Sequence, residues 1–294
     1  MPYAGVSELL SAGTTSEGPA ALVRRSGRVF GQFDHRTQDS GNVSWLVETP
    51  AGAFFVKSAG TPDPPPTGAP VPYFDHAGRV RLLRNAVDLS RSCCHPCLAR
   101  LRNVIESPVG PALVYDYAPG ESLGTSATHR SDPTSAYQRF ARLPGDQLLC
   151  HFDALIDLHR LLADVGWVAG DLYDGCLLVE FSTGRLTVID LDSYRRGPSV
   201  NTMGRMFGAT RFMAPEEFQF GAPIDQRTTV FTLGRLVWHV GTRLTERAEQ
   251  FCGTSAARSV VERAIAPSRK DRFDRVADLA AAWQTARRSP ATPR

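Results

Sequence analysis

The sequence predicts an α+β protein with a mainly β first part and a mainly helical second part. Alternating apolar residues and turn signals dominate the chain up to about residue 117, whereas apolar residues recur at helical spacing after the segment "APGESLG". With 294 residues, 42% of them apolar and 21% charged, the chain is long enough for one large domain or two small lobes.

The first strands are expected in the segment "GNVSWLVETPAGAFFVKSAG". Val43, Trp45 and Val47 alternate with other residues, "TPAG" gives a turn, and a second apolar run leads to Lys57. This pattern is typical of a β-hairpin. The next segment, "GTPDPPPTGAPVP", is too rich in proline and glycine for a helix or a central strand, so we expect an extended, exposed connector there.

One helix and two further strands are expected to complete the first part. Val80, Leu83 and Val87 recur at helical spacing between residues 77 and 89, which predicts the helix. The segment "LARLRNVIESPVGPALVYDY" contains two apolar runs separated by a turn, which predicts the strands. The first part is therefore mainly a sheet with one helix.

A long amphipathic helix is expected in the second part. Its apolar face carries Leu148, Phe152, Leu155, His159 and Leu162. Asp146 is the expected N-cap of this helix, and Gly166 is expected to end it. A histidine on such a face is more often a hydrogen-bonded core residue than a catalytic one, so His159 is assigned to the core.

Composition and charge favour a cytoplasmic protein with no nucleic-acid or membrane partner. The 33 basic and 30 acidic residues leave a net charge of +3, which is too balanced for a nucleic-acid-binding surface, although the end "ARRSPATPR" is locally basic. The sequence has no apolar run of about 18 residues and no secretion signal at its start.

The six cysteines are too few and too scattered for a disulfide framework, so free thiols are expected. Cys93, Cys94 and Cys97 stand in "CCHPC", which has the spacing of half a zinc site. No second pair of ligands follows at a suitable distance. A turn between a helix and a strand is therefore preferred to a zinc site at this position.

A series of motifs runs along the chain in a fixed order. Their sequences are "FFVK", "LVYDYAPGESL", "LHRLL", "GDLYDGCLLV", "VIDLD", "GATRFMAPEE", "TLGRLVW" and "APSRKDRF". In this order the chain resembles the protein kinase family, in particular the bacterial eukaryotic-like serine/threonine kinases, with atypical motifs. The resemblance runs from about Gly31 to Trp283. It implies a bilobal protein-kinase-like fold with an N-lobe at residues 31–117 and a C-lobe at residues 118–287, flanked by an N-terminal extension at 1–30 and a basic tail at 288–294.

Phosphoryl transfer needs a cation on the nucleotide phosphates, a metal ion on hard oxygen ligands and a carboxylate at the acceptor hydroxyl. Lys57, Asp190 and Asp171 fit these three tasks in turn. Lys57 follows an apolar run, where an ammonium needs an anionic partner such as a phosphate, and the alternative is an edge-strand lysine that reaches solvent. Asp171 and Asp190 also follow apolar runs, and their alternative is a pair of turn-capping carboxylates on an inactive fold.

The resemblance implies ATP and Mg²⁺ as cofactors and a protein as the substrate, and it assigns the site residues. Asp171 and Lys57 are the catalytic residues, and Asp190 and Asp192 bind the metal. The nucleotide-binding residues are Gly41, Val43, Lys57, Asp116, Tyr117, Ala118, Ser122 and Leu178. The substrate-binding residues are Thr210, Ala214, Pro215 and Glu216, and Arg272 is expected to pair with Glu216.

Several positions depart from the family pattern. They are Arg79 for the helix glutamate that pairs with the lysine, Ala169 and Gly170 for His-Arg, Tyr173 for a lysine, Cys176 for a metal-binding asparagine, Asp192 for the glycine of D-F-G, and Thr229 for an aspartate. A thiol is a poor ligand for magnesium. Asp192 is therefore the expected substitute for the oxygen lost at Cys176, with a helix or turn cap as the alternative.

The glycine at position 170 also bears on the loop between Asp190 and "APE". Many protein kinases order this loop by phosphorylating it, and the phosphate then binds the arginine of H-R-D. Glycine has no side chain to receive a phosphate. We therefore expect the loop to be held by packing of Met203, Met206 and Phe207.

The function expected from the resemblance is ATP-dependent phosphorylation of serine or threonine on a protein, because "GATRFMAPEE" is similar to the segment that cradles the acceptor peptide. Two alternatives stay open. One is a pseudokinase scaffold that binds nucleotide without turnover, which the losses at Cys176 and Arg79 favour. The other is a small-molecule kinase acting on an antibiotic or a sugar, which the short "GD" loop favours.

Overall fold

The computed structural model describes residues 8–288, so residues 1–7 and most of the predicted basic tail, 289–294, lie outside the described residues. The fold is α+β, as the sequence predicts. The described chain forms two compact units. The first consists of residues 8–94 with Ala99–Ala118, and the second consists of His95–Leu98 with residues 119–288.

The first unit is built on a five-stranded antiparallel sheet with the strand order β1-β2-β3-β5-β4. The strands are β1 (Arg28–Phe33), β2 (Val43–Thr49), β3 (Gly52–Ser58), β4 (Leu101–Ser107) and β5 (Gly110–Asp116). The predicted hairpin is confirmed as β2 and β3, and the two later strands are confirmed as β4 and β5.

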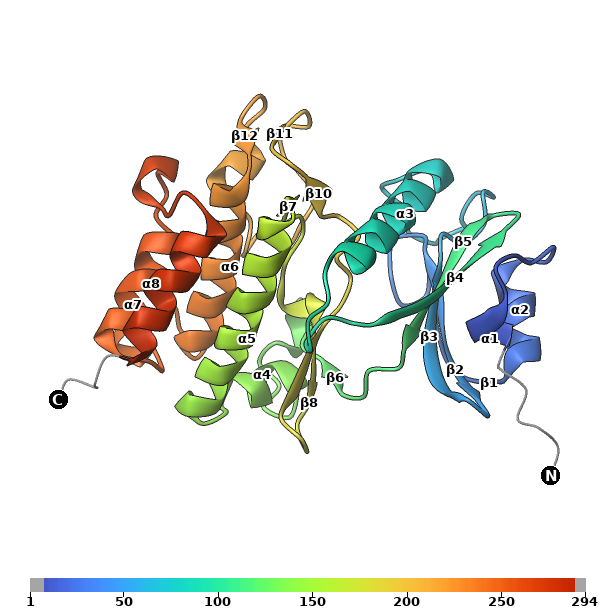
Figure 1. Cartoon of the computed structure of the whole chain (residues 1–294), viewed down its shortest axis with the longest axis horizontal. Coiled ribbons are helices and arrows are strands. Elements are labelled where there is room, and N and C mark those ends of the chain that lie inside the picture. Colours follow the sequence, from blue (N-terminus) through green and yellow to red (C-terminus); the bar gives the residue numbers. More distant parts are fainter. Residues whose placement is uncertain (1–7, 289–294) are drawn as a thin grey trace. The chain divides into compact units, whose positions relative to one another are not determined.

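Helices pack on both faces of this sheet, α3 on one side and α1 with α2 on the other (Figure 1). Their bounds are α1 (Glu8–Ser11), α2 (Pro19–Ser26) and α3 (His76–Ser92). Leu9 and Leu22 of the first two helices share a core with Trp45, whereas Leu83 of α3 packs with Leu113. Successive side chains of a strand point to opposite faces, so each strand contributes to both cores.

The segments on either side of α3 are as predicted. The proline-rich connector before it has no regular structure, and Val71 and Tyr73 within it are largely exposed. α3 covers the predicted helix and is capped by Asp75, whose carboxylate accepts the amide of Gly78 at 2.7 Å. "CCHPC" forms the turn before β4. Within residues 8–288, no three His, Cys, Asp or Glu side chains are arranged to hold a metal ion.

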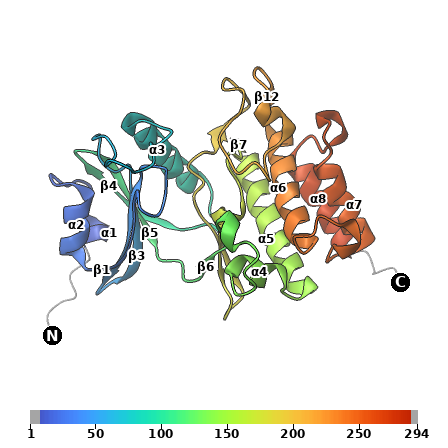
Figure 2. The same ribbon diagram turned by 180° about the vertical axis from the view of Figure 1, so that it is seen from behind.

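The second unit is mainly helical. Its helices are α4 (Ala136–Ala141), α5 (Gly145–Asp164), α6 (Gln226–Gly241), α7 (Ser255–Ala264) and α8 (Val276–Arg288). The four longer helices lie side by side in both views (Figures 1 and 2). None of the described helices has the length and apolar composition that a membrane crossing requires.

The long helix predicted in the second part is confirmed as α5, but its predicted N-cap is wrong. Pro144 is the N-cap residue, and Asp146 lies in the first turn. An acidic residue in the first turn is favoured by the positive end of the helix dipole. Gly166 follows the C-cap with a φ of 90°, so the predicted end is confirmed.

His159 is a core residue, as predicted. It is fully buried in α5, with Nδ1 2.7 Å from the carbonyl oxygen of Leu155 and Nε2 2.7 Å from the hydroxyl of Tyr194. Burial lowers the pKa of His159 to about 4, so the imidazole is neutral at physiological pH.

Short strands connect the helices of the second unit. They are β6 (Glu121–Ser122), β7 (Trp167–Val168), β8 (Leu177–Glu180), β9 (Arg185–Val188), β10 (Arg195–Arg196), β11 (Ser199–Val200) and β12 (Pro223–Ile224). β6, β8 and β9 form one small sheet, and β7 with β10 and β11 with β12 form two ribbons.

Candidate active site

The predicted site residues divide between the two units. The first unit contains Gly41, Val43, Lys57, Asp116, Tyr117 and Ala118. The second unit contains Asp171, Asp190, Asp192, Ser122, Leu178, Thr210, Ala214, Pro215 and Glu216. Each unit therefore carries its own part of the predicted site.

Lys57 lies in β3, the central strand of the sheet, with Ser44 of β2 and Leu113 of β5 as its cross-strand neighbours. It is therefore not an edge-strand lysine, and its side chain is half-buried. The chain has only two lysines, Lys57 and Lys270, among its 33 basic residues. This arginine-rich background is a signal in the sequence that motif reading missed, because position 57 is one of only two that carry a lysine.

Arg79, which stands in place of the expected helix glutamate, binds backbone rather than a carboxylate. Its guanidinium donates to the carbonyl oxygens of Ala59 at 2.8 Å, Phe74 at 2.9 Å and Thr61 at 3.0 Å. Burial lowers the pKa of Arg79 from its ordinary value. This side chain fixes the segment that follows β3, and it offers no negative charge to Lys57.

Gly41 and Val43 lie where β2 begins. Gly41 has a φ of 75°, in the left-handed region that favours glycine. Val43 is the first residue of β2, and its carbonyl oxygen accepts the hydroxyl of Ser58 at 3.1 Å. This pair closes the end of the hairpin next to Lys57.

The predicted nucleotide-binding residues Asp116, Tyr117 and Ala118 lie at the end of β5, of which Asp116 is the last residue. The amide of Asp116 donates to the carbonyl oxygen of Arg100 at 3.0 Å, and the amide of Tyr117 donates to that of Ala53 at 3.1 Å. Tyr117 is 37% exposed, and Ala118 is the last residue of the first unit. The first two of these amides are thus bound to neighbouring backbone of the first unit. In the second unit, Ser122 of β6 lies directly opposite Leu178 of β8.

Asp171 follows β7 in the left-handed region, with a φ of 51°. Its Oδ1 accepts the amide of Ala209 at 3.2 Å, which ties the carboxylate to the start of "ATRFMAPEE". Just before it, the amide of Ala169 donates to Thr229 Oγ1 of α6 at 2.9 Å. Thr229 thus anchors the backbone that the replaced aspartate anchors in the family pattern.

Asp190 follows β9, also in the left-handed region, with a φ of 62°. Cys176 joins it to Asp171, because its carbonyl oxygen accepts the amide of Ile189 at 2.8 Å and its thiol donates to the carbonyl oxygen of Asp171 at 3.4 Å. Asp190 is exposed, whereas Asp192 is only 7% exposed. The structure therefore brings the ends of the two predicted strands together at Cys176.

The thiol of Cys176 is neutral. Burial raises its pKa well above the ordinary value, and the charges of Asp190 and Asp171 raise it further. A buried, protonated thiol that donates to a carbonyl oxygen is not a ligand for Mg²⁺. Cys176 therefore does not replace the metal-binding asparagine oxygen of the family pattern.

Gly170 has a steric reason to be glycine. A Cβ at this position would lie 2.3 Å from the carbonyl oxygen of Ser193. Arg195 of β10 pairs with Val168 of β7 just beyond this contact. The segment after Asp190 therefore passes directly over Gly170, and this packing excludes any side chain there, including the arginine of the family pattern.

The loop after Asp190 was expected to be held by packing of three side chains, and one of the three is buried. Met206 is buried in a small core with Val168, Met213 and Ile224. Met203 and Phe207 are half-buried.

An ion pair with Arg272 holds the segment that contains Thr210, Ala214, Pro215 and Glu216. Thr210 is exposed and Pro215 half-buried, while Ala214 and Glu216 are buried. Glu216 accepts both terminal nitrogens of Arg272, at 2.8 and 3.0 Å, so the predicted pair is confirmed. These contacts hold the segment in place. Of the four predicted substrate-binding residues, Thr210 and Pro215 have solvent-exposed surface.

Arg211 is a residue that sequence reasoning missed. It binds Asp174 at 2.8 Å and lies 3.3 Å from both the Tyr137 hydroxyl and His239 Nε2. His239 Nδ1 in turn donates to Glu246 at 2.5 Å, and this bond holds the pKa of Glu246 well below its usual range. The network joins the acceptor segment to the turn after Asp171. The arginine in "GATRFM" is the only local signal.

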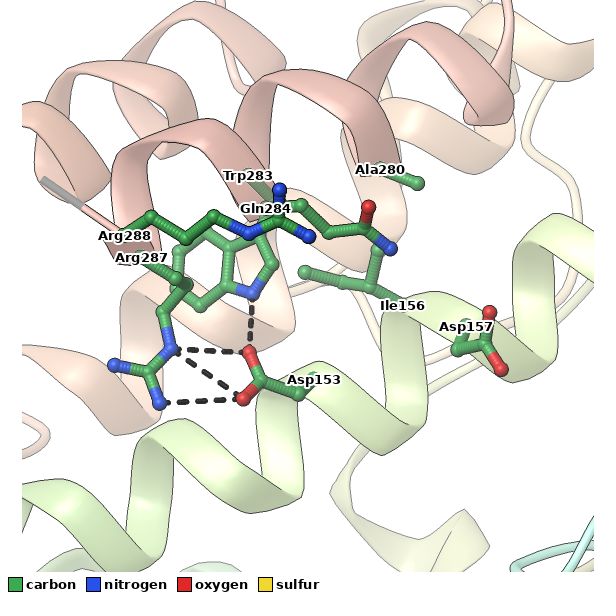
Figure 3. Close-up of a pocket in the computed structure, with 8 residues that line it drawn as sticks. All are labelled: Asp153, Ile156, Asp157, Ala280, Trp283, Gln284, Arg287 and Arg288. Carbon is green, nitrogen blue, oxygen red and sulfur yellow. Dashed lines mark hydrogen bonds and ion pairs between the residues drawn. The ribbon is translucent and has the colours of Figure 1, made fainter.

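A small pocket lies elsewhere in the second unit, where α5 meets α8 (Figure 3). It has a volume of about 200 Å³ and none of the predicted site residues line it. Asp153 in its wall accepts Trp283 Nε1 at 2.6 Å and Arg287 Nε at 3.1 Å. This carboxylate already joins the two helices, so the pocket has no role in the candidate site.

The chain matches no model of a known protein family, and none of the curated proteins matches it either.

Proposed function

We propose that the chain is an ATP- and Mg²⁺-dependent phosphotransferase of the protein kinase fold that acts on serine or threonine of a protein. In this proposal residues 31–117 form the N-lobe and residues 118–287 the C-lobe. The observation that carries it is the convergence of Asp171 and Asp190 at Cys176, because two carboxylates at strand ends are what phosphoryl transfer requires.

Each residue has a defined task in the proposal. Lys57 binds the phosphates of ATP, and Asp171 orients the acceptor hydroxyl and takes its proton. The amide of Ala209 holds the Asp171 carboxylate in position, so the acceptor segment and the base are linked by one hydrogen bond of 3.2 Å. Thr210 and Pro215 offer surface to the acceptor protein.

One carboxylate at the end of β9, that of Asp190, suits a magnesium ion. Asp190 is an exposed carboxylate in a left-handed turn, and oxygen is the donor that Mg²⁺ prefers. Asp190 would hold the ion, and Asp192 would supply the oxygen that Cys176 lacks. When bound, the ion neutralises charge on the phosphates.

A second function, nucleotide binding without turnover, is favoured by Cys176. Its thiol is buried and neutral, so the second metal ligand of the family pattern has no direct replacement at that position. A scaffold of this kind would keep Lys57 and lose phosphoryl transfer.

Transfer of labelled phosphate from ATP to generic protein acceptors, with Mg²⁺ or Mn²⁺, tests the first function. Removing a general base lowers the rate by about 10² to 10⁴. Asp171→Asn should therefore reduce transfer at least about a hundredfold, whereas Asp146→Asn on the exposed first turn of α5 should leave it unchanged. Equal transfer by the two variants would contradict the role of Asp171.

The two lysines allow a separate test of nucleotide binding. Acetylation by a small amine-reactive ester, read by mass spectrometry, reports Lys57 against the exposed Lys270 as an internal reference. ATP with Mg²⁺ should slow acetylation of Lys57 alone. Protection of Lys57 without transfer to any acceptor would favour the scaffold, and no protection at millimolar ATP would exclude both functions.

A further inference from the structure

One face of the sheet in the first unit carries a row of aromatic rings beside Lys57. The strand register places Phe33 of β1 opposite Ser44, which lies opposite Lys57, and it places Phe55 opposite Tyr115. Cross-strand partners share a face, and residues two apart on a strand do so as well. The three rings and the lysine therefore lie on the same face.

The rings contact one another in sequence across the strands. The centroids of Phe33 and Phe55 are 6.3 Å apart, and those of Phe55 and Tyr115 are 6.5 Å apart. A T-shaped pair of Phe30 with Tyr117, at 5.7 Å, adds two more rings at the other end of the strands. We call Phe33, Phe55 and Tyr115 the aromatic row.

The two cores of the unit leave part of this row open. On the opposite face, Trp45 and Phe54 are buried beneath α1 and α2. On the same face, α3 covers Leu113 and reaches Tyr115, but neither core includes Phe33 or Phe55. Phe33 is 39% exposed and Phe55 is half-buried. Partly exposed rings in a row are a surface on which a flat ligand can stack.

The charge on this face narrows the choice of ligand. Lys57 lies two residues along β3 from Phe55 and on the same face, so the Cα atoms of the cation and the ring are about 7 Å apart. A molecule that joins an aromatic ring system to an anionic chain matches both features. A nucleotide has this composition.

We infer that the first unit holds the base of its nucleotide by stacking on Phe55, with Phe33 and Tyr115 beside it, and that it therefore accepts adenine and guanine alike. The inference rests on the proposed function and adds the mode of base recognition. Stacking is tolerant of base identity because every base has a π-face, whereas recognition by hydrogen bonds is selective.

The amides of Asp116 and Tyr117 already donate to Arg100 and Ala53, so neither of these two amides is a donor for a base edge.

Competition against acetylation of Lys57 tests the inference, with Lys270 as the reference and ATP, GTP and inorganic tripolyphosphate as the competitors. ATP and GTP should protect Lys57 at half-maximal concentrations within about threefold of each other. Tripolyphosphate should need at least about fivefold more, because it lacks the base that stacks on the ring.

Single variants distinguish the contribution of the ring to nucleotide binding from that of the phosphate contacts. Phe55→Leu should raise the half-maximal concentrations of ATP and GTP about tenfold and leave that of tripolyphosphate unchanged. Phe33→Leu, at the exposed end of the row, should have a smaller effect in the same direction and serves if Phe55→Leu fails to fold. Phe220→Leu removes a ring that is 77% exposed in the second unit and should change nothing.

The outcomes are distinguishable. A preference for ATP over GTP greater than about thirtyfold, or unchanged protection in both ring variants, would overturn the stacking inference and leave the proposed function intact. Failure of all three competitors to protect Lys57 would overturn the proposed function, and the inference with it.

Discussion

The hydrogen bond between Ala169 and Thr229 offers a direct test of how the backbone before Asp171 is held. Thr229 is 1% exposed, and its Oγ1 is 2.9 Å from the amide of Ala169, which is itself buried. Thr229→Val keeps the shape of the side chain and removes the acceptor. A buried amide left without a partner costs about 1–3 kcal/mol.

The expected loss in the free energy of unfolding is thus about 2 kcal/mol. For a protein of this size class that corresponds to a fall in melting temperature of roughly 4–8 °C. Amide hydrogen exchange gives the local readout: the Ala169 amide should exchange at least about tenfold faster in Thr229→Val.

Thr229→Ser is the matched control because it keeps the oxygen and loses a methyl group. It should cost about 1 kcal/mol, close to the value for one buried methylene, and leave the Ala169 amide protected. If Thr229→Val were as stable as the parent and the amide exchanged at the same rate, the anchoring role of Thr229 would be refuted.

Three further predictions follow from packing and charge. Gly170→Ala should lower stability by about 1–3 kcal/mol because the Cβ would lie 2.3 Å from a carbonyl oxygen, whereas Gly13→Ala, with nothing within 4 Å, should not; equal melting temperatures would contradict this. Burial raises the pKa of Glu217 from 4.5 to about 7, so its contribution to stability is present below pH 4.5 and is lost as pH rises towards 7. Glu217→Gln should therefore reduce the fall in the free energy of unfolding, measured in urea, between pH 4.5 and about 7. If the fall were the same in Glu217→Gln, another group would cause it. Arg272→Met should lower the free energy of unfolding in chemical denaturation by about 1.5–3 kcal/mol, because it removes two charged hydrogen bonds to buried Glu216, which keeps Arg269 at 2.6 Å as its remaining cation. Adding Glu216→Gln should recover part of that loss, and a fully additive double variant would argue against the pair.

The elements with strong periodicity could be predicted from the sequence. The hairpin of β2 and β3, the helix α3 and the helix α5 were all in the expected places because each buries a regular face. The cap of α5 was wrong, since a preference for aspartate at the N-cap is weaker than the local geometry set by Pro144. Helices α1 and α2 were not foreseen, because they are too short to form alone and depend on packing against the sheet.

The candidate site was predictable where a motif is local. Asp171, Asp190 and the pair of Glu216 with Arg272 follow from short segments. The network around Arg211 could not be foreseen, because its partners Asp174 and His239 are far from it along the chain. The steric demand at position 170 also needs the fold, since it depends on where a later segment passes.

The core shared by α1, α2 and the sheet has a consequence for synthesis on the ribosome. Leu9 and Leu22 are translated before the strands on which they pack, and Val114 of the same core is added only when most of the first unit has been translated. Helices of this length are marginal without their packing partners. The apolar side chains of α1 and α2 therefore lack part of their core until β5 has left the exit tunnel. Slow translation across the first part of the chain would lengthen that interval and lower the yield of folded protein.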